Sequence, residues 1–469
     1  MGDGRAGPPI RFGTSGWRGI LGEGVSFDRA RVVAGAVVAW ARASSPAPRI
    51  LVAHDTRFLA DSIAASLARV VAAAGGRALL VEGPVPTPVA THAVRRRHCA
   101  AGLVVTASHN PPEYCGIKVV MPWGAGAPSE VTRALERVCA RLAVPPEAES
   151  AGRRVHPLGA YRADLARRID TGAIRGARLH VAYDALHGTG AGVVDRFLGA
   201  AGARLERLRC EPDPAFGGGA PDPTPARLEP LRRCLRRGPA SLGLATDGDA
   251  DRFAVVDAGG RILSETESVA LLVDHLARSR KLRGGVALSI ATGTLVERVA
   301  REAGLEVERH PIGFKWLSAA LRDGRAEIAG EESGGFAWAP FARDKDAVLA
   351  CALVAEMAAC ARGPLAGRLA ALERRFGALR CSRRALAASP RRLAGLRRLH
   401  RAPPARFDGS AARASLRYGA LRLDLDDGFA VLRASGTEPV VRVYAEAPDR
   451  ERLARRLDAA ARLLERAGR

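Results

Sequence analysis

The stretch "RILVAHDTRFLADSIAASLARVVAAAGGRALLVEG" (residues 49–83) indicates the fold class of this chain. Residues 49–55 form an apolar run that is typical of a buried strand, and residues 77–83 form a second one. Between them, residues 61–75 have the apolar spacing of a helix, which ends at a Gly–Gly pair. Two strands joined by one helix make a βαβ unit, whose strands lie in a mainly parallel sheet. The sequence therefore predicts an α/β fold.

The alternation of strands and helices recurs along the chain. We predict a further strand within residues 98–108 and more strands within 177–192, 241–257 and 326–338. The proline-rich, polar segment 142–152 is a candidate domain boundary.

The last part of the chain has a different pattern. Residues 421–447 are typical of strands, and an amphipathic helix follows them, so this part indicates a separate α+β module. A length of 469 residues is consistent with three or four domains. We predict three α/β domains and one C-terminal α+β domain, at residues 1–148, 149–258, 259–372 and 373–469.

The net charge of +23 suggests nucleic-acid binding, but the composition argues against a specific site. Of the 72 basic residues only four are lysine, and the 68 arginines are spread along predicted helices. Aromatic residues make up 5% of the chain, which leaves little for stacking on bases. We expect no specific nucleic-acid partner.

The sequence also predicts a protein of the reduced cytoplasm. No stretch approaches the roughly 20 apolar residues that a membrane span needs, and the N-terminus lacks the apolar region of a signal peptide. The eight cysteines include no C-x-x-C pair, which argues against a zinc site and a disulfide framework.

The scarcity of lysine points to candidate site residues. Arginine does not deprotonate in proteins, so it cannot replace lysine where a proton has to move. Lys118, Lys315 and Lys345 lie in or near polar loops, whereas Lys281 has no motif around it and is expected at the surface.

The first candidate loop, "TASHNPPEYCGIKVV" (106–120), places Ser108 beside His109. One interpretation is a serine hydrolase. However, the chain has no G-x-S-x-G elbow, and an extended backbone would point His109 away from Ser108. The hydrolase interpretation is therefore disfavoured.

The second loop, "TDGDADR" (246–252), holds three alternating aspartates. Carboxylates this close repel one another unless a cation neutralises them, and oxygen ligands suit Mg²⁺ or Ca²⁺. The EF-hand pattern fails because Arg252 stands where that pattern has glycine. A Mg²⁺ site would imply a phosphate nearby, which a phosphorylated Ser108 would supply; the alternative is a solvated acidic turn.

Three further loops hold polar groups that suit phosphate or sugar. "RASGTEP" (433–439) combines a guanidinium, hydroxyls and glycine, which suits a phosphate but also a helix cap. "GEESGG" (330–335) suits sugar hydroxyls, with a β-turn bearing surface acids as the alternative. "FGTSGWRG" (12–19) is either a structural turn or an anion contact.

These motifs, taken in order, resemble those of the α-D-phosphohexomutases, the phosphoglucomutase/phosphomannomutase superfamily. The resemblance covers essentially the whole chain, including residues 12–19. It implies four domains around a central cleft, the last of the TATA-binding-protein-like type.

The resemblance also implies a mechanism and a set of site residues. Ser108 would carry a phosphoryl group and pass it to a hexose monophosphate, giving a bound 1,6-bisphosphate. Lys118, His109 and Arg18 are the candidates for moving the proton, and Lys118 is preferred as the base. Mg²⁺ would be held by Asp247, Asp249, Asp251 and the phosphate on Ser108. Substrate contacts are implied for Arg252, Lys315, Glu331, Ser333, Lys345, Arg433, Ser435, Gly436 and Thr437.

The loop "GEESGG" and the segment "HPIGFKWL" (310–317) are most similar to glucose-type enzymes. The leading hypothesis is therefore interconversion of glucose 1-phosphate and glucose 6-phosphate, with glucose 1,6-bisphosphate as intermediate and activator. A phosphomannomutase or dual-specificity enzyme is the first alternative, and a basic nucleic-acid-binding or scaffold protein with an inactive mutase fold is the second. We expect hexose phosphates as ligands, no membrane partner, and a monomer or weak dimer.

Overall fold

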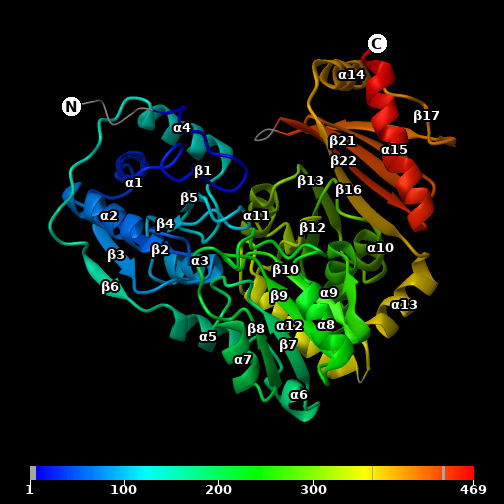
Figure 1. Ribbon diagram of the computed structural model, residues 1–469, viewed down its shortest axis with the longest axis horizontal. Helices are drawn as coiled ribbons and strands as arrows, with labels where there is room; N and C mark the ends of the chain where they lie inside the picture. Colours follow the sequence, from blue (N-terminus) through cyan, green and yellow to red (C-terminus); the bar gives the residue numbers. More distant parts are fainter. Residues whose placement is uncertain (1–6, 362, 436–438) are drawn as a thin grey trace.

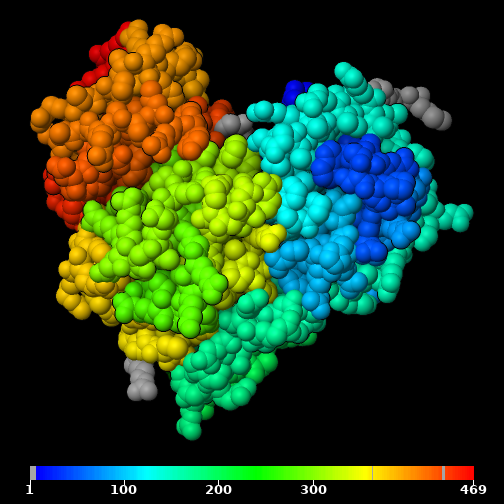
Figure 2. All heavy atoms as spheres, turned by 180° about the vertical axis from the view of Figure 1, so that it is seen from behind, coloured from blue at the N-terminus to red at the C-terminus, as the bar shows by residue number. Residues whose placement is uncertain are grey.

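In the described part of the chain, four large sheets with their helices follow one another, and β17 and β18 form a small fifth sheet within the last unit (Figure 1). The structure is a computed structural model that describes residues 7–361, 363–435 and 439–469. The N-terminal unit (blue) and the C-terminal unit (orange to red) lie on opposite sides of the middle of the molecule. The view from behind shows the third unit (yellow-green) between them (Figure 2). The predicted class, three mixed α/β units and a C-terminal α+β unit, is confirmed.

The first unit is a six-stranded mixed sheet with helices. Its elements are β1 (Trp17–Ile20), α1 (Phe27–Ala41), β2 (Arg49–His54), α2 (Ala60–Ala73), β3 (Arg77–Val81), α3 (Thr87–Arg96), β4 (Ala101–Val105), β5 (Tyr114–Val120), α4 (Ser129–Cys139) and β6 (Arg153–Val155). The strand order is β1-β5-β4-β2-β3-β6, in which β4, β2, β3 and β6 are parallel. The βαβ unit predicted within residues 49–83 is present as β2, α2 and β3.

The second unit is a five-stranded mixed sheet. Its elements are α5 (Leu158–Ala166), α6 (Thr171–Gly176), β7 (His180–Asp184), α7 (Val194–Ala200), β8 (Arg204–Leu208), α8 (Glu229–Arg237), β9 (Leu242–Thr246), β10 (Phe253–Asp257), the short 3-10 helix η1 (Ala258–Gly260) and β11 (Arg261–Leu263). The order is β11-β10-β9-β7-β8, with β9, β7 and β8 parallel and β10 antiparallel to β9. The acidic loop is the turn between β9 and β10.

The third unit is a four-stranded sheet in the order β13-β12-β14-β15. Its elements are α9 (Glu265–Ser279), β12 (Gly285–Ser289), α10 (Thr294–Glu302), β13 (Val307–His310), α11 (Phe314–Arg322), β14 (Ala326–Gly330), β15 (Phe336–Trp338), α12 (Ala347–Ala361) and α13 (Leu365–Phe376). α12 has the sequence AVLACALVAEMAACA, which is apolar on all sides, so this helix is buried. It packs on β9 and β10 of the second sheet, and the two units therefore share one core.

The fourth unit is an antiparallel sheet in the order β16-β22-β21-β20-β19. Its elements are β16 (Arg380–Ala387), α14 (Pro390–Arg401), β17 (Arg406–Phe407), β18 (Ser410–Ala411), β19 (Arg413–Arg417), β20 (Ala420–Leu425), β21 (Gly428–Ala434), β22 (Val440–Ala447) and α15 (Arg450–Ala467). α14 and α15 cover one face of this sheet. The other face contacts the third unit through Phe429, Val431 and Tyr444, which pack against Ile290 and Ala291.

The sheets divide the chain at slightly different residues from those expected. β6 belongs to the first sheet although it follows residue 148, and β11 pairs with β10 although it follows residue 258. α13 runs across residue 372. Short edge strands lack a long apolar run, so their membership is decided by which sheet edge is free to pair with them.

Within the described residues, no single helix is long and apolar enough to cross a membrane, although α12 and α13 reach that length and composition as a bent pair.

Asp346 joins the second and third units. Its carboxyl group accepts a hydrogen bond from the Tyr161 hydroxyl of α5 (2.8 Å) and another from the Leu349 N–H (2.8 Å), which caps the start of α12. The residue is 1% exposed, and burial raises the pKa of Asp346 to about 7. The cap is therefore a carboxyl group that titrates near neutral pH.

Replacement Asp346→Asn is expected to make the stability less dependent on pH. The same carboxyl has a pKa of about 3.9 in an unfolded chain, so the folded state retains a proton that the unfolded state releases. Its stabilising contribution is complete below about pH 4 and is lost as the pH rises to about 7, by up to about 4 kcal/mol. Asparagine keeps the acceptor for Tyr161 and does not titrate. The free energy of unfolding in urea, variant minus wild type, should therefore increase between about pH 4 and pH 7; a constant difference would contradict this account.

Candidate active site

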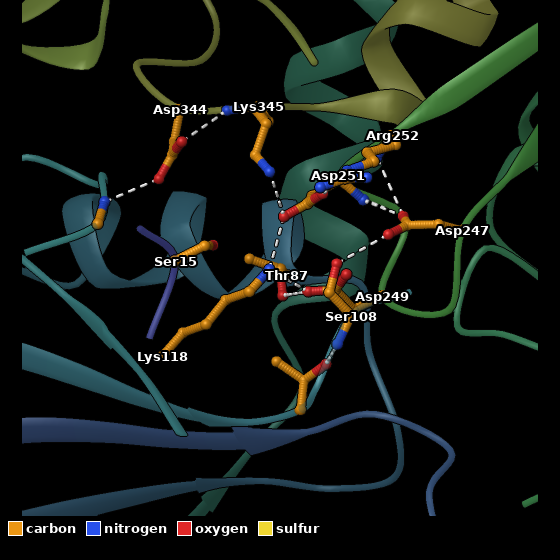
Figure 3. Close-up of polar contacts among 12 residues, drawn as sticks. Ser15, Thr87, Ser108, Lys118, Asp247, Asp249, Asp251, Arg252, Asp344 and Lys345 are labelled. Atoms are coloured by element: carbon orange, nitrogen blue, oxygen red, sulfur yellow. Dashed lines mark hydrogen bonds and ion pairs between the residues drawn. The ribbon is translucent and has the colours of Figure 1, made fainter. Parts of the chain in front are cut away.

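The three aspartates of the acidic loop lie together in the turn between β9 and β10 (Figure 3). Asp247, Asp249 and Asp251 are at most 2% exposed, and one carboxylate oxygen from each lies within 4.8 Å of the others. The turn also approaches the Ser108 loop closely, since a Cβ added at Gly248 would lie 2.7 Å from the Ser108 carbonyl oxygen. Glycine is therefore required at this contact.

Ser108 points at the aspartates. Its Oγ donates a hydrogen bond to Asp247 Oδ2 (2.8 Å), while Asp247 Oδ1 accepts from the backbone N–H groups of Asp251 (2.9 Å) and Arg252 (3.0 Å). The backbone of Ser108 has a φ of 55°, in the left-handed region that residues with a side chain rarely adopt. This conformation turns the hydroxyl out of the loop and toward the acidic turn.

Two lysines from other units neutralise the aspartates. Lys118 of β5 donates to Asp249 Oδ2 (2.5 Å) and Asp251 Oδ2 (2.6 Å), and Lys345 lies 3.0 Å from the same oxygen of Asp251. Figure 3 shows the two ammonium groups approaching Asp251 from different sides. The cluster thus combines side chains of the first, second and third units.

The charges of this cluster are strongly perturbed. Burial, with repulsion from Asp251 and Asp249, raises the pKa of Asp247 to about 8. Burial alone would raise the pKa of Asp251, but Lys118 and Lys345 hold it well below its usual value. Burial opposes the charge of Lys118, yet Asp249 and Asp251 raise the pKa of this lysine above its usual value. Lys118 is therefore an ammonium group in this arrangement.

The aspartates fit a divalent cation. Asp249 Oδ1 and Asp251 Oδ1 are buried and have no hydrogen-bond partner in the described structure. Buried polar atoms without partners are uncommon and carry a free-energy cost, and carboxylate oxygens are the ligands that Mg²⁺ and Ca²⁺ prefer. With Asp247 they provide three oxygen donors from one turn.

His109, Arg18 and Arg252 contact the Ser108 loop or the acidic turn. The backbone at Ser108 is left-handed rather than extended, so His109 does not point away as expected: its Nδ1 lies 3.5 Å from Ser108 Oγ. Burial, then Arg252 and Arg18, hold the pKa of His109 well below its usual value. Arg18 donates to Asn110 Oδ1 (2.8 Å) in the same loop. A neutral histidine therefore lies beside the hydroxyl, and the charges of two arginines act on this histidine.

The other predicted contacts lie outside this cluster. Ser333 donates to Glu331 Oε1 (2.6 Å) in the loop after β14. Lys315 donates to Ser129 Oγ (2.7 Å) at the start of α4, across the boundary between the third and first units.

Arg433 and Lys315 form a second positive region. Burial lowers the pKa of Lys315, and the charges of Arg133 and Arg433 act in the same direction. Arg433 lies near the end of β21 and Ser435 just beyond it. Gly436 and Thr437 fall outside the described residues.

Two residues of the cluster were missed by the sequence analysis. Thr87 hydrogen-bonds to Asp249 through both its side chain and its backbone N–H, and Asp344 accepts from the backbone N–H groups of Gly126 (2.7 Å) and Lys345 (2.9 Å). Thr87 begins α3, directly after the loop that follows β3, and this position was the available signal, because ligands gather at the carboxyl ends of parallel strands.

The Ser108 hydroxyl contacts a buried carboxylate cluster, and two lysines contact the same cluster. Such an arrangement of a hydroxyl, carboxylates and cations suits the transfer of phosphoryl groups. Four domain profiles of a single family match the chain in succession: "Phosphoglucomutase/phosphomannomutase, alpha/beta/alpha domain I" at residues 9–143, domain II at 159–260, domain III at 265–376 and the C-terminal domain at 378–463. The chain therefore belongs to the phosphoglucomutase/phosphomannomutase family, within the α-D-phosphohexomutase superfamily, and is an intramolecular phosphotransferase, an isomerase.

Similar proteins extend over the whole chain. A "Phosphoglucomutase/phosphomannomutase" of Thermococcus kodakarensis is 28% identical over 97% of this chain and 98% of its own. A "Phosphoglucosamine mutase" of Frankia alni is 31% identical over 93% and 94%. The crystal structure of a phosphoglucomutase/phosphomannomutase family protein from Burkholderia thailandensis has a TM-score of 0.85, with 26% identity and 98% of both chains covered.

Replacement Lys345→Met is expected to destabilise the metal-free protein and to enlarge the stabilising effect of Mg²⁺. Loss of one ammonium group leaves the buried carboxylates less well neutralised, which costs about 3–5 kcal/mol when a buried pair is broken. A divalent cation would then bind more tightly and restore stability. Thermal unfolding with a chelator and with Mg²⁺ measures both effects, and exposed Lys281→Met is the control. The absence of any Mg²⁺-induced shift in both proteins would count against a cation site at these aspartates, and equal shifts would count against its coupling to Lys345.

Proposed function

We propose that the protein is a Mg²⁺-dependent mutase that interconverts glucose 1-phosphate and glucose 6-phosphate, with Ser108 as the phosphoryl carrier and glucose 1,6-bisphosphate as intermediate and activator. The observation that carries the proposal is the 2.8 Å contact between Ser108 Oγ and the buried aspartate cluster. His109 Nδ1 lies 3.5 Å from Ser108 Oγ, which is long for a hydrogen bond, and the lowered pKa of His109 makes it a weak base. It is therefore poorly suited to activate the serine as a nucleophile. The cluster suits a phosphorylated serine beside a cation.

Each half-reaction moves one phosphoryl group and one proton. The bond between Ser108 Oγ and phosphorus breaks, and phosphorus bonds to O6 of glucose 1-phosphate. The O6 hydroxyl loses its proton, and Ser108 Oγ gains one. After the bisphosphate turns round, its 1-phosphoryl group returns to Ser108 and glucose 6-phosphate leaves. Mg²⁺ bound by Asp247, Asp249 and Asp251 would supply Lewis-acid stabilisation of the phosphoryl oxygens.

Lys118 is our candidate for exchanging the proton. It is protonated while it contacts Asp249 and Asp251, so in this arrangement it is an acid rather than the expected base. To accept a proton from the sugar hydroxyl, its amine must first leave these carboxylates. Arg18 and Arg252 remain as permanent cations that stabilise the transferring group, because arginine does not deprotonate.

The predicted contact residues outside the aspartate cluster suit the sugar hydroxyls and the second phosphate of the substrate. Glu331 and Ser333 offer a carboxylate and a hydroxyl to sugar hydroxyls, and their mutual hydrogen bond fixes both groups. Arg433 and Ser435 come from the fourth unit and Lys315 from the third, and they suit the phosphate that does not react. We include Gly436 and Thr437 in this phosphate site by their sequence motif alone, and Lys345 as a contact near the reacting end.

A second candidate is a mutase for another hexose phosphate. The 31% identity to a phosphoglucosamine mutase favours glucosamine phosphate, and the 28% identity to a phosphoglucomutase/phosphomannomutase favours mannose phosphate. The pair Glu331 and Glu332 in "GEESGG" is our reason for preferring glucose, because the resemblance of this loop is to the glucose-type enzymes.

Replacement Ser108→Ala is expected to lower mutase turnover by at least about a thousandfold, because the phosphoryl carrier is lost. Intact-mass measurement after incubation with glucose 1,6-bisphosphate should detect one added phosphoryl group on the wild type and none on the variant. Exposed Ser44→Ala is the matched control and should behave as the wild type in both assays. Undiminished turnover in Ser108→Ala would overturn the mechanism.

A panel of 1-phosphates tests the substrate. We expect kcat/KM for glucose 1-phosphate to exceed those for mannose 1-phosphate and glucosamine 1-phosphate by about tenfold or more. Each reaction is followed by formation of the corresponding 6-phosphate. A faster reaction with either competitor would replace the glucose assignment and leave the phosphoserine mechanism standing.

A further inference from the structure

Arg57 lies directly behind the loop that carries Ser108. It follows β2 in the segment "HDTR" (54–57), and its side chain is fully buried. A guanidinium group has five N–H donors, and all five have an acceptor here. The Nε donor binds Asp55 Oδ2 (3.2 Å), which balances the charge. The other four donors bind backbone carbonyls.

These four carbonyls belong to the Ser108 loop. Arg57 Nη2 donates to the carbonyls of Ser108 (2.7 Å) and Asn110 (2.6 Å). Its Nη1 donates to those of Pro111 (2.7 Å) and Tyr114 (2.8 Å). A buried carbonyl without a partner is unfavourable, so the path of the whole loop depends on this one side chain.

Ser108 needs this support because its backbone is strained. Its φ of 55° is maintained only when the surroundings fix it. The N–H of Ser108 donates to Thr106 Oγ1 (2.8 Å), and its carbonyl accepts from Arg57. Both peptide groups that flank the serine are therefore held, and its Oγ is directed at Asp247.

Phe216 of the second unit covers the guanidinium group of Arg57. The Phe216 ring lies over the guanidinium, 5.0 Å from the ring centroid, and Phe216 is fully buried. Its backbone carbonyl accepts from Arg227 Nη2 (2.6 Å), which fixes its own loop. An aromatic face attracts a cation and excludes water from it, so the hydrogen bonds of Arg57 are shielded from competition by solvent.

We propose that Arg57, covered by Phe216 of the neighbouring unit, is a positioning residue that holds the Ser108 loop in the geometry needed for phosphoryl transfer. This inference rests on the proposed role of Ser108. Arg57 touches neither the sugar nor the phosphoryl group; it acts through four carbonyls. Lysine cannot replace it, because an ammonium group has three donors and leaves at least two of the five acceptors without a partner.

Replacement Arg57→Lys, which keeps the charge, tests the proposal by two measurements. Hydrogen exchange followed by mass spectrometry should become faster in residues 106–114 and remain unchanged in the fourth unit. Turnover should fall by about a hundredfold, the usual effect of a small misplacement of a reacting group. Affinity for the sugar phosphate, measured by calorimetry on Ser108→Ala with and without the Arg57 change, should stay within about threefold.

Arg456→Lys is the matched control. Arg456 is also fully buried and also pairs with carboxylates, Asp427 and Asp408, but it lies in the fourth unit. It should lose stability without faster exchange in residues 106–114 and with turnover near that of the wild type. If Arg57→Lys resembles this control in loop exchange and turnover, Arg57 is only structural and the proposal is wrong.

Phe216→Leu tests the contribution of the second unit. It removes the aromatic face and keeps an apolar side chain, so we expect faster exchange in residues 106–114 and a loss of turnover of about tenfold. Phe197→Leu, a buried change in α7 of the same unit, should leave the loop unaffected. Equal loop exchange in the two variants would remove Phe216 from the proposal.

The two measurements separate this inference from the proposed function. A wild-type protein without mutase activity on any hexose phosphate would refute the proposed function. The hydrogen-exchange rate of residues 106–114 in Arg57→Lys would still show whether Arg57 orders the loop. An active wild type with unchanged turnover in Arg57→Lys would refute the positioning role alone.

Discussion

The structure depends on the burial of three acidic side chains in one turn. Asp247, Asp249 and Asp251 are at most 2% exposed, and carboxylate oxygens from all three lie within 4.8 Å. Charges this close repel strongly in a protein interior unless cations compensate them. The chain brings these cations from elsewhere: Lys118 comes from the first unit and Lys345 from the third. The aspartates therefore hold three units together, and the position of the active site follows from this charge balance.

The close contact between the Ser108 loop and the acidic turn also determines the backbone conformation around the site. Ser108 and Ala250 both have φ values in the left-handed region, at 55° and 54°, and Gly248 leaves room for the Ser108 carbonyl. Such conformations are unfavourable in isolation and persist only where the surroundings fix them. Here the surroundings are rigid, because α12 of the third unit is buried against the second sheet and shares its core. The loops therefore have little freedom of position.

The fourth unit contributes in a different way. It contacts the third unit through one face of its sheet, and the fully buried Glu446 accepts a hydrogen bond from the Thr294 N–H (2.7 Å) at the start of α10. A carboxylate at this end of a helix is favourable because the first N–H groups have no partner within the helix. This contact fixes the sheet that carries Arg433, whose charge acts on Lys315. The packing of the fourth unit on the third therefore determines where the positive region of Arg433 and Lys315 lies.

The sequence by itself determined the fold class and the loops that carry the chemistry. Local apolar periodicity reveals β2, α2 and β3, and polar residues at strand ends mark Ser108 and the three aspartates, because a core would not accept them. It did not reveal Thr87, Arg57 or the true direction of His109, nor that β6 completes the first sheet. Only the tertiary structure decided these, since each depends on a contact between distant segments: 139 residues separate Ser108 from Asp247, and 131 separate Lys118 from Asp249. Residue patterns specify elements, whereas the packing of one unit on another specifies which side chains meet.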